Sequence, residues 1–167
     1  MFRRFFPDEW VDSTYDIDFE QLHKDGVKGF IFDIDNTLVP HGAPADERCL
    51  KLFDNFRKWD ISYCLLSNNQ SKRVSSFATQ INAKYIENAH KPSTKNYFKA
   101  MGMMRTDTSN TVFVGDQLFT DVWGAKRAGI RNFLVKPIHP KEEIQIVLKR
   151  YIEKIVLFFY KRKRGIR

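Results

Sequence analysis

Two aspartates stand one residue apart at the end of an apolar run, in the stretch GFIFDIDNTLVP that covers residues 29–40. Like charges at this spacing repel each other, and burying either carboxylate without a partner is costly. An apolar strand has no structural use for two anions at its exit. Asp33 and Asp35 therefore predict a positively charged partner at this point of the fold.

Polar groups also follow the other apolar runs of the chain. The segments SNN, HKPS and GDQLFTD, at residues 67–69, 90–93 and 115–121, each come after such a run. Because ligands bind beyond the carboxyl ends of parallel strands, which meet at one edge of a sheet, we expect these segments to form a single site with the first pair of aspartates.

The repulsion among carboxylates that converge at one edge is offset most simply by a hard divalent cation. Mg²⁺ prefers oxygen ligands and commonly binds one or two carboxylates together with phosphate oxygens of a substrate. We expect Asp33 and Asp116 to be its ligands, with Asp121 as a further or water-mediated ligand. The backbone carbonyl of Asp35 is a fourth candidate. The predicted cofactor is Mg²⁺.

The remaining polar residues of the site are donors. Ser67, Asn68 and Lys91 supply hydroxyl, amide and ammonium groups, a set suited to phosphate oxygens. Donors and a cation opposite a carboxylate describe a phosphoryl-transfer site. There, Asp33 can attack phosphorus to form an aspartyl phosphate. Asp35 can protonate the leaving alcohol and afterwards deprotonate the hydrolytic water.

Short strands alternating with helices must position these groups. Periodicity and capping signals predict strands over 27–35, 61–67, 84–87, 111–116 and 131–135, and helices over 16–24, 44–59, 70–81, 92–103, 119–128 and 141–160. Alternation of this kind predicts an α/β fold with a doubly wound, mostly parallel five-stranded sheet.

The composition is typical of one globular domain, because the 167 residues are 43% hydrophobic and 29% charged. No apolar run approaches the ~20 residues that a transmembrane helix needs. The N-terminal stretch MFRRFFPDEW lacks the features of a secretory signal, and neither Cys49 nor Cys64 fits a metal or redox motif. We therefore expect a cytoplasmic protein without a transmembrane span.

The net charge of +8 is concentrated at the C-terminal end. Residues 141–167 carry nine Lys or Arg against three Glu. We therefore divide the chain into a core over 1–140 and a basic amphipathic C-terminal helix and tail over 141–167. A basic tail suits nucleic acid or an anionic membrane surface, and it is often only a solvated end.

The four polar segments DIDNTL, LLSNN, HKPS and GDQLFTD resemble, in order and spacing, the motifs of the haloacid dehalogenase-like (HAD) phosphatases. The resemblance implies that Asp33 is the nucleophile and Asp35 the general acid/base. It also implies that Ser67 and Lys91 bind the substrate phosphate, and that both aspartates of the last motif serve the magnesium site.

HAD enzymes that act on small metabolites usually carry a cap domain between the first motifs. Here 33 residues separate Asp33 from Ser67 and 23 separate Ser67 from Lys91, so no cap domain fits. An uncapped site admits large substrates. The expected substrate is a phosphate on a protein, on a nucleic acid end or on a lipid head group.

Both ends of the chain combine aromatic residues with cations. The stretch IVLFFY at 155–160 is apolar all round and is followed by KRKRGIR, and the chain starts with MFRRFF. The helix also carries an apolar stripe made of Ile144, Leu148, Ile152, Ile155 and Phe159. Such a helix end must bury in the core, in a partner or in the interfacial zone of a membrane. The plain alternative is that both ends pack on the sheet.

Small size, no cap, WGAKRAG after the last motif and basic-aromatic ends resemble the YqeG group, which is related to mitochondrial phosphatidylglycerophosphate phosphatases. The resemblance implies phosphatidylglycerophosphate as substrate, with the protein peripheral on the inner face of an anionic cell membrane.

Two other hypotheses about the function stay open. One is a polynucleotide or protein phosphatase whose basic tail binds nucleic acid or an acidic partner. The tail's aromatics precede its charges in one block, which fits a membrane edge better than base stacking. The other is a binding module that has lost turnover, against which the intact set of motif residues argues. The sequence leaves the oligomeric state open.

Overall fold

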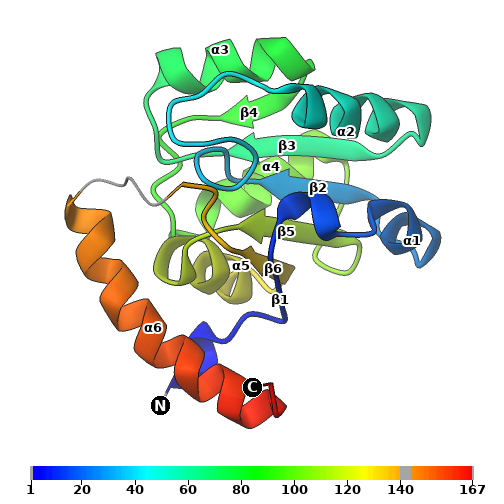
Figure 1. Ribbon diagram of the computed structural model, residues 1–167. Coiled ribbons are helices and arrows are strands. Elements are labelled where there is room, and N and C mark those ends of the chain that lie inside the picture. Colours follow the sequence, from blue (N-terminus) through cyan, green and yellow to red (C-terminus); the bar gives the residue numbers. More distant parts are fainter. Residues whose placement is uncertain (1, 140–143, 167) are drawn as a thin grey trace.

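The computed structural model describes residues 2–139 and 144–166, and these form a parallel sheet with helices on both faces (Figure 1). The sheet has six strands in the order β1-β6-β5-β2-β3-β4. All neighbouring strands pair in parallel. The strands are β1 (Glu9–Val11), β2 (Gly29–Phe32), β3 (Ser62–Leu66), β4 (Lys84–Ile86), β5 (Thr111–Gly115) and β6 (Arg131–Val135).

Helices connect successive strands and complete the predicted α/β architecture. The α-helices are α1 (Phe19–Lys24), α2 (Glu47–Lys58), α3 (Ser71–Ile81), α4 (Lys95–Met104), α5 (Trp123–Arg127) and α6 (Ile144–Arg164). Shorter turns are the 3₁₀ helices η1 (Phe2–Phe5) and η2 (Thr14–Asp16) and the π-helical η3 (Leu118–Val122). The predicted helix over 119–128 is thus a π-helical turn that leads into α5. Residues 141–143 of the last predicted helix lie outside the described residues.

The fold class is confirmed, but the predicted strand count of five was wrong. The additional strand, β1, has only three residues and pairs at the edge of the sheet, with Glu9 opposite Phe133 and Val11 opposite Val135. Three residues are too few to show an alternating pattern, so the sequence carries no periodic signal for this strand.

Two hydrophobic clusters pack against opposite faces of the sheet, because successive side chains of a strand point to opposite sides. Phe30 and Phe32 of β2 pack with Phe19 of α1 and Phe56 of α2. Ile31, between them, belongs to the cluster on the other face, which includes residues of α4 and α5. The buried interior leaves only the strand ends for polar chemistry.

The described chain has no cap domain between the first motifs. Only the loop before α2 and α2 itself lie between β2 and β3, and only α3 with its flanking turns lies between β3 and β4. The carboxyl edge of the sheet is therefore open on this side, as the spacing predicted.

Helix α6 runs along one side of the molecule beside the N-terminal segment (Figure 1). Its inward residues Val156 and Tyr160 are buried, at 1% and 3% exposure. Val156 packs in a third cluster with Leu118 and Leu134. The ring of Tyr160 meets the ring of Phe6 edge to face, with centroids 5.5 Å apart. The plain alternative, in which the ends pack on the fold, is thus correct for this inner face.

The opposite side of α6 exposes large apolar side chains, and we call it the outward face. It consists of Leu148, Tyr151, Ile152, Ile155, Phe158 and Phe159, whose exposed fractions lie between 43% and 63%. All the described members of the predicted apolar stripe therefore point away from the core. The reason is that the inner face carries Arg150 and Glu153, which bind the loop after β5.

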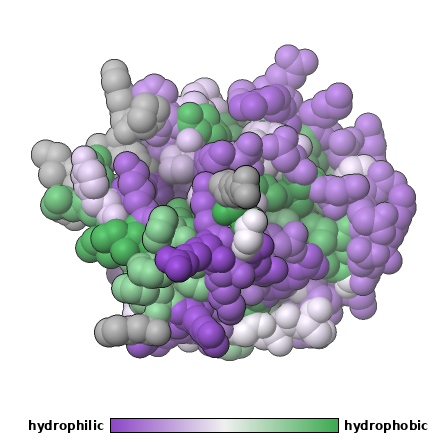
Figure 2. Space-filling model, turned by 60° about the horizontal axis from the view of Figure 1, so that its bottom comes forward, coloured by the Kyte–Doolittle hydropathy of each residue, from purple (hydrophilic) through white to green (hydrophobic). Residues whose placement is uncertain are grey.

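Figure 2 shows hydrophobic side chains gathered beside strongly hydrophilic ones on the side of the molecule where α6 lies. Within the described residues, no helix has the length and apolarity to cross a bilayer.

Substitutions on the two sides of α6 should change the free energy of unfolding by different amounts. Val156→Ala removes buried methyl groups and should lower the free energy of unfolding by about 2 kcal/mol. Ile155→Ala, at a neighbouring exposed position, should change it by less than about 0.5 kcal/mol. Urea denaturation of both variants measures the difference, and equal losses would contradict the placement of α6.

Candidate active site

Three buried carboxylates converge at the carboxyl edge of the sheet. Asp33 directly follows β2 and Asp116 directly follows the neighbouring strand β5, while Asp121 lies in η3. Oxygen atoms of all three lie within 4.8 Å of one another. Their exposed fractions are 7%, 2% and 0%. The structure thus brings together three of the four predicted metal ligands.

Lys91 provides the positive charge that the sequence demanded beside Asp33. Its Nζ donates to Asp33 Oδ1 at 2.7 Å and to Asp121 Oδ1 at 2.6 Å. Burial works to lower the pKa of Lys91, but the carboxylates of Asp121 and Asp33 raise it above its usual value. The ammonium therefore stays charged and bridges the nucleophile candidate to the last motif.

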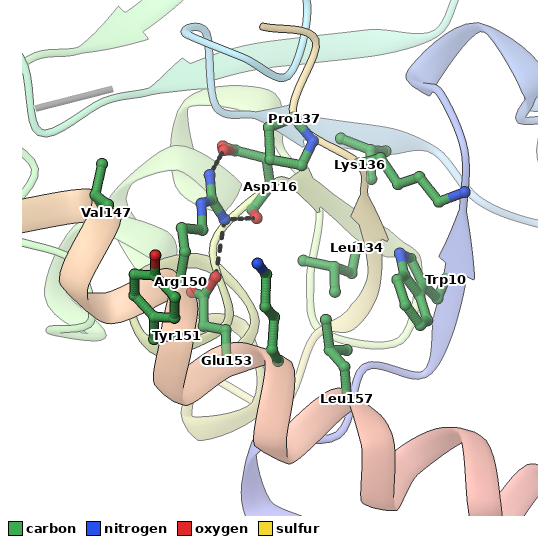
Figure 3. Close-up of a pocket in the computed structure, with 12 residues that line it drawn as sticks. Trp10, Asp116, Leu134, Lys136, Pro137, Val147, Arg150, Tyr151, Glu153 and Leu157 are labelled. Carbon is green, nitrogen blue, oxygen red and sulfur yellow. Dashed lines mark hydrogen bonds and ion pairs between the residues drawn. The ribbon is translucent and has the colours of Figure 1, made fainter. Parts of the chain in front are cut away.

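A second cation, Arg150 of α6, reaches the cluster and was not among the predicted site residues. Arg150 forms an ion pair with the Asp116 carboxylate, and its Nη1 also donates to the Asp116 carbonyl at 2.5 Å. Glu153, one turn further on, accepts from Arg150 Nη1 at 2.9 Å (Figure 3). It also accepts from the backbone N–H of Leu118 at 2.8 Å. In the sequence these two residues are indistinguishable from solvated charges of a basic helix.

Burial of the carboxylates changes their acidity. Burial raises the pKa of Asp33 to about 6, with Lys91 opposing the shift and Asp121 adding to it. Burial also raises the pKa of Asp116, as do Asp33 and Asp121, while Arg150 opposes the shift. Three carboxylates thus face two cations. A further cation would complete the neutralisation.

The donor set fits Mg²⁺. The three converging side chains offer only carboxylate oxygens, which are the hard ligands that this ion prefers. Asp33, Asp116 and Asp121 would hold it. When bound, such an ion neutralises charge on the phosphoryl group and polarises its oxygens. Thr37 also contacts the carboxylate cluster, because its hydroxyl lies 3.1 Å from Asp116 Oδ1 and 3.3 Å from Asp33 Oδ2.

Gly115 allows Asp121 to approach the end of β5. A Cβ atom at this position would lie 2.5 Å from Asp121 Oδ2, which is too close for any real side chain. The same oxygen accepts from the backbone N–H groups of Asp116 and Gln117, at 3.1 Å and 3.0 Å. The glycine of GDQLFTD is therefore required by the contact between the two ends of the motif.

Asp35 is not a member of the three-carboxylate cluster, and its carboxylate binds other groups nearby. It pairs with Arg73 Nη2 at 2.9 Å, accepts from the backbone N–H of Gly42 at 2.7 Å and contacts the Asn69 amide. A carboxylate held at the side of the pocket suits proton transfer better than metal binding. Its predicted contribution as a metal ligand through the backbone carbonyl stays a prediction.

The predicted phosphate-binding residues Ser67 and Asn68 differ in the hydrogen bonds that their side chains make. Ser67 is buried, and its Oγ accepts from the backbone N–H of Asn69 at 3.1 Å. The Asn68 side chain accepts from Lys91 N at 2.8 Å and donates to Lys91 O at 3.2 Å. Asn68 therefore fastens the Lys91 loop to the end of β3, and its role toward phosphate stays a prediction.

These residues surround a pocket of about 250 Å³. Besides the predicted residues, its lining includes His41, Gln117, Thr120 and Lys149. Lys149 comes from α6, so this helix contributes to the catalytic pocket as well as to the carboxylate cluster.

The parallel sheet and the carboxylates at its edge define the class of the protein. The HAD-hydrolase-like family model matches residues 88–143, which include Lys91 and both aspartates of the last motif. The chain is 35% identical to the probable phosphatase YqeG of Bacillus subtilis over 165 residues, which cover 98% of this chain and 96% of that protein. It belongs to the YqeG family of HAD-like phosphatases.

Two further proteins are similar over a large part of the chain. Phosphatidylglycerophosphate phosphatase 1 of Arabidopsis thaliana is 27% identical over 160 residues, which cover 87% of this chain and 44% of the plant protein. The chain thus spans less than half the length of that relative. The structure of 3-deoxy-D-manno-octulosonate 8-phosphate phosphatase from Moraxella catarrhalis, with magnesium and phosphate ions, matches with a TM-score of 0.55 and 13% identity. The match covers 72% of this chain and 76% of that one, and shows the shared fold.

The raised pKa values of the buried carboxylates predict a pH-dependent stabilisation by metal. Because the pKa of Asp33 is raised to about 6, the folded protein binds more protons than the unfolded chain between about pH 4 and pH 6. Without metal, its stability should fall as the pH rises through this window. A cation that binds ionised carboxylates competes with these protons, so Mg²⁺ should raise the melting temperature by several degrees at about pH 8 and much less at about pH 5.

Differential scanning fluorimetry with Mg²⁺ or chelator measures this effect. Asp116→Asn serves as the control variant, because it removes one carboxylate of the cluster and should lose most of the shift at both pH values. An equal Mg²⁺ shift in the wild type and in this variant would contradict the assignment of the metal ligands.

Proposed function

We propose that the protein is a Mg²⁺-dependent phosphatase that converts phosphatidylglycerophosphate into phosphatidylglycerol and phosphate at an anionic membrane surface. One observation carries the proposal. A single helix, α6, bonds to the carboxylate cluster on its inner face and exposes a broad apolar face on its outer side. This connects the reaction site physically to a surface that suits lipid.

In the proposed reaction, a carboxylate oxygen of Asp33 forms a bond to phosphorus as the bond to the lipid oxygen breaks. Asp35 gives its proton to the departing oxygen, which becomes the hydroxyl of phosphatidylglycerol. Water then attacks phosphorus and gives a proton to Asp35, which releases phosphate and restores both carboxyl groups. Lys91 and Ser67, both buried at the pocket, hold the phosphoryl oxygens.

The surface of α6 supports the membrane part of the proposal. The outward face is apolar along the helix, and the last turn of the helix carries four consecutive cations, Lys161, Arg162, Lys163 and Arg164. A helix that is apolar on one side and rich in Lys and Arg elsewhere is typical of binding in the plane of a membrane interface. Each such cation contributes roughly 1 kcal/mol near an anionic leaflet. We therefore expect the protein to be peripheral on the inner face of the cell membrane.

The relatives support the substrate and the metal. The Arabidopsis protein that matches this chain is a phosphatidylglycerophosphate phosphatase. The Moraxella phosphatase that shares the fold contains a magnesium ion. A polynucleotide phosphatase would bind through a basic surface with interleaved aromatics, whereas the outward face of α6 is a continuous apolar one.

Substitution of the two aspartates of the first motif should separate their roles. Asp33→Asn should abolish turnover on every substrate, because the amide does not attack phosphorus. Asp35→Asn should slow hydrolysis of phosphatidylglycerophosphate far more than that of p-nitrophenyl phosphate, whose leaving group departs with little protonation. Phosphate release measures both, and circular dichroism checks the fold. Equal losses on the two substrates in Asp35→Asn would argue against its role as the acid.

The outward face of α6 should be needed for membrane binding and not for chemistry. The double variant Ile155→Gln and Phe158→Gln should lose at least about tenfold in affinity for anionic liposomes, because burial of two large side chains is lost. It should keep wild-type activity on p-nitrophenyl phosphate. The matched control is Leu50→Gln with Phe98→Gln, which changes two exposed apolar residues on α2 and α4.

Liposome sedimentation compares the two double variants. The control should bind liposomes as the wild type does, and binding of the wild type should weaken as salt concentration rises. If both variants bind fully, the membrane part of the proposal is wrong.

A further inference from the structure

A second pocket, larger than the catalytic one, lies between α6 and the edge of the sheet (Figure 3). We call it the α6 pocket. Its volume is about 420 Å³, within the range of pockets that bind small organic ligands. Its walls are the inner side of α6, the end of β6 with the residues that follow, and Trp10 of β1. The lining is mostly apolar and includes Leu134, Pro137, Val147 and Leu157.

One residue of the α6 pocket lining, Trp10, carries an N–H without a partner among the described residues, and the carboxylates of the lining are already engaged. The indole N–H of Trp10 is buried and has no hydrogen-bond partner in the described part of the chain. Buried polar groups are nearly always paired, so this one calls for an acceptor from outside. The two carboxylates of the lining, Asp116 and Glu153, are both paired with Arg150. A ligand that brings an acceptor, such as an ester carbonyl, fits this arrangement.

The α6 pocket lies next to the reaction site. Asp116 forms part of its wall and also belongs to the carboxylate cluster with Asp33. Consecutive residues of α6 line the two pockets, Lys149 the catalytic pocket and Arg150 the α6 pocket. In the view of Figure 3, Arg150 and Asp116 lie between Val147 on one side and Leu134 with Trp10 on the other.

The α6 pocket also adjoins the surface that we assign to the membrane. Tyr151 lines the pocket and belongs to the outward face, with 63% exposure, and Val147 lines it with 37% exposure. Lys154, also in the lining, places a positive charge there. The α6 pocket and the outward face thus share Tyr151 and lie side by side on the helix.

We propose that the α6 pocket binds the acyl-ester end of the lipid substrate while its phosphomonoester occupies the catalytic pocket. The inference rests on the proposed function, because it assumes that the leaving group is a lipid. Trp10 donates its N–H to an ester carbonyl, and Lys149 and Arg150 face the phosphodiester where it passes between the two pockets. Helix α6 thereby encloses the leaving group in a protein without a cap domain.

The test compares two substrates that differ only in their acyl chains. One is short-chain phosphatidylglycerophosphate, used below its micelle concentration so that membrane binding plays no part. The other is its deacylated, water-soluble counterpart, which keeps both phosphates. Val147→Trp fills the α6 pocket with bulk, and Ile155→Trp adds the same bulk to the outward face of the same helix.

Val147→Trp should raise KM for the acylated substrate at least about tenfold and leave both kinetic constants for the deacylated one unchanged. Ile155→Trp should change neither substrate. Equal changes for both substrates in Val147→Trp, or no change for either, would overturn the proposal.

Direct binding is measured through Trp10 in a background with Trp59→Phe and Trp123→Phe. Short-chain phosphatidylglycerol with brominated acyl chains should quench Trp10 fluorescence saturably, and the deacylated head group should not. Absence of quenching would overturn the pocket assignment. This experiment also separates the two proposals, because wild-type protein that fails to hydrolyse phosphatidylglycerophosphate refutes the proposed function whether or not the product lipid quenches Trp10.

Discussion

The structure depends on one electrostatic constraint, which is the burial of three carboxylates at the end of adjacent parallel strands. Asp33, Asp116 and Asp121 are held together by Lys91, which bridges two of them, and by Arg150, which pairs with the third. Removing either cation would leave carboxylates buried against each other. The loops after β2, β4 and β5 therefore have to converge, and their polar side chains gather at one place on the sheet edge.

The same constraint explains why α6, the last helix in the sequence, is attached to the carboxylate cluster. Arg150 and Glu153 attach the helix to the loop that carries Asp116, while Val156 and Tyr160 bury its inner side. This attachment turns the apolar outward face toward the surroundings and places Lys149 at the catalytic pocket. One helix thus contributes both to the lining of the pocket beside the carboxylates and to the exposed apolar surface that we propose for lipid binding.

Much of the fold and most of the site could be predicted from the sequence, because each main strand is a short apolar run that polar site residues follow directly. Asp33, Asp116, Asp121 and Lys91 follow such runs and meet as expected. Strand β1 escaped prediction because three edge residues form no pattern. The orientation of α6 escaped because its apolar residues are numerous enough for either face, and only the long-range pairing of Arg150 with Asp116 decides between them. Such contacts between distant segments leave no local signal.

We propose that the carboxylate of Asp33, held between Lys91 and Thr37, receives the phosphoryl group. Rapid acid quenching of the enzyme during turnover, followed by peptide mass spectrometry, tests this role. We expect a transient phosphoryl mass on the peptide that contains residues 29–40, located on Asp33 and absent when Mg²⁺ is chelated. A phosphoryl group on another residue, or turnover without any labelled peptide, would contradict it.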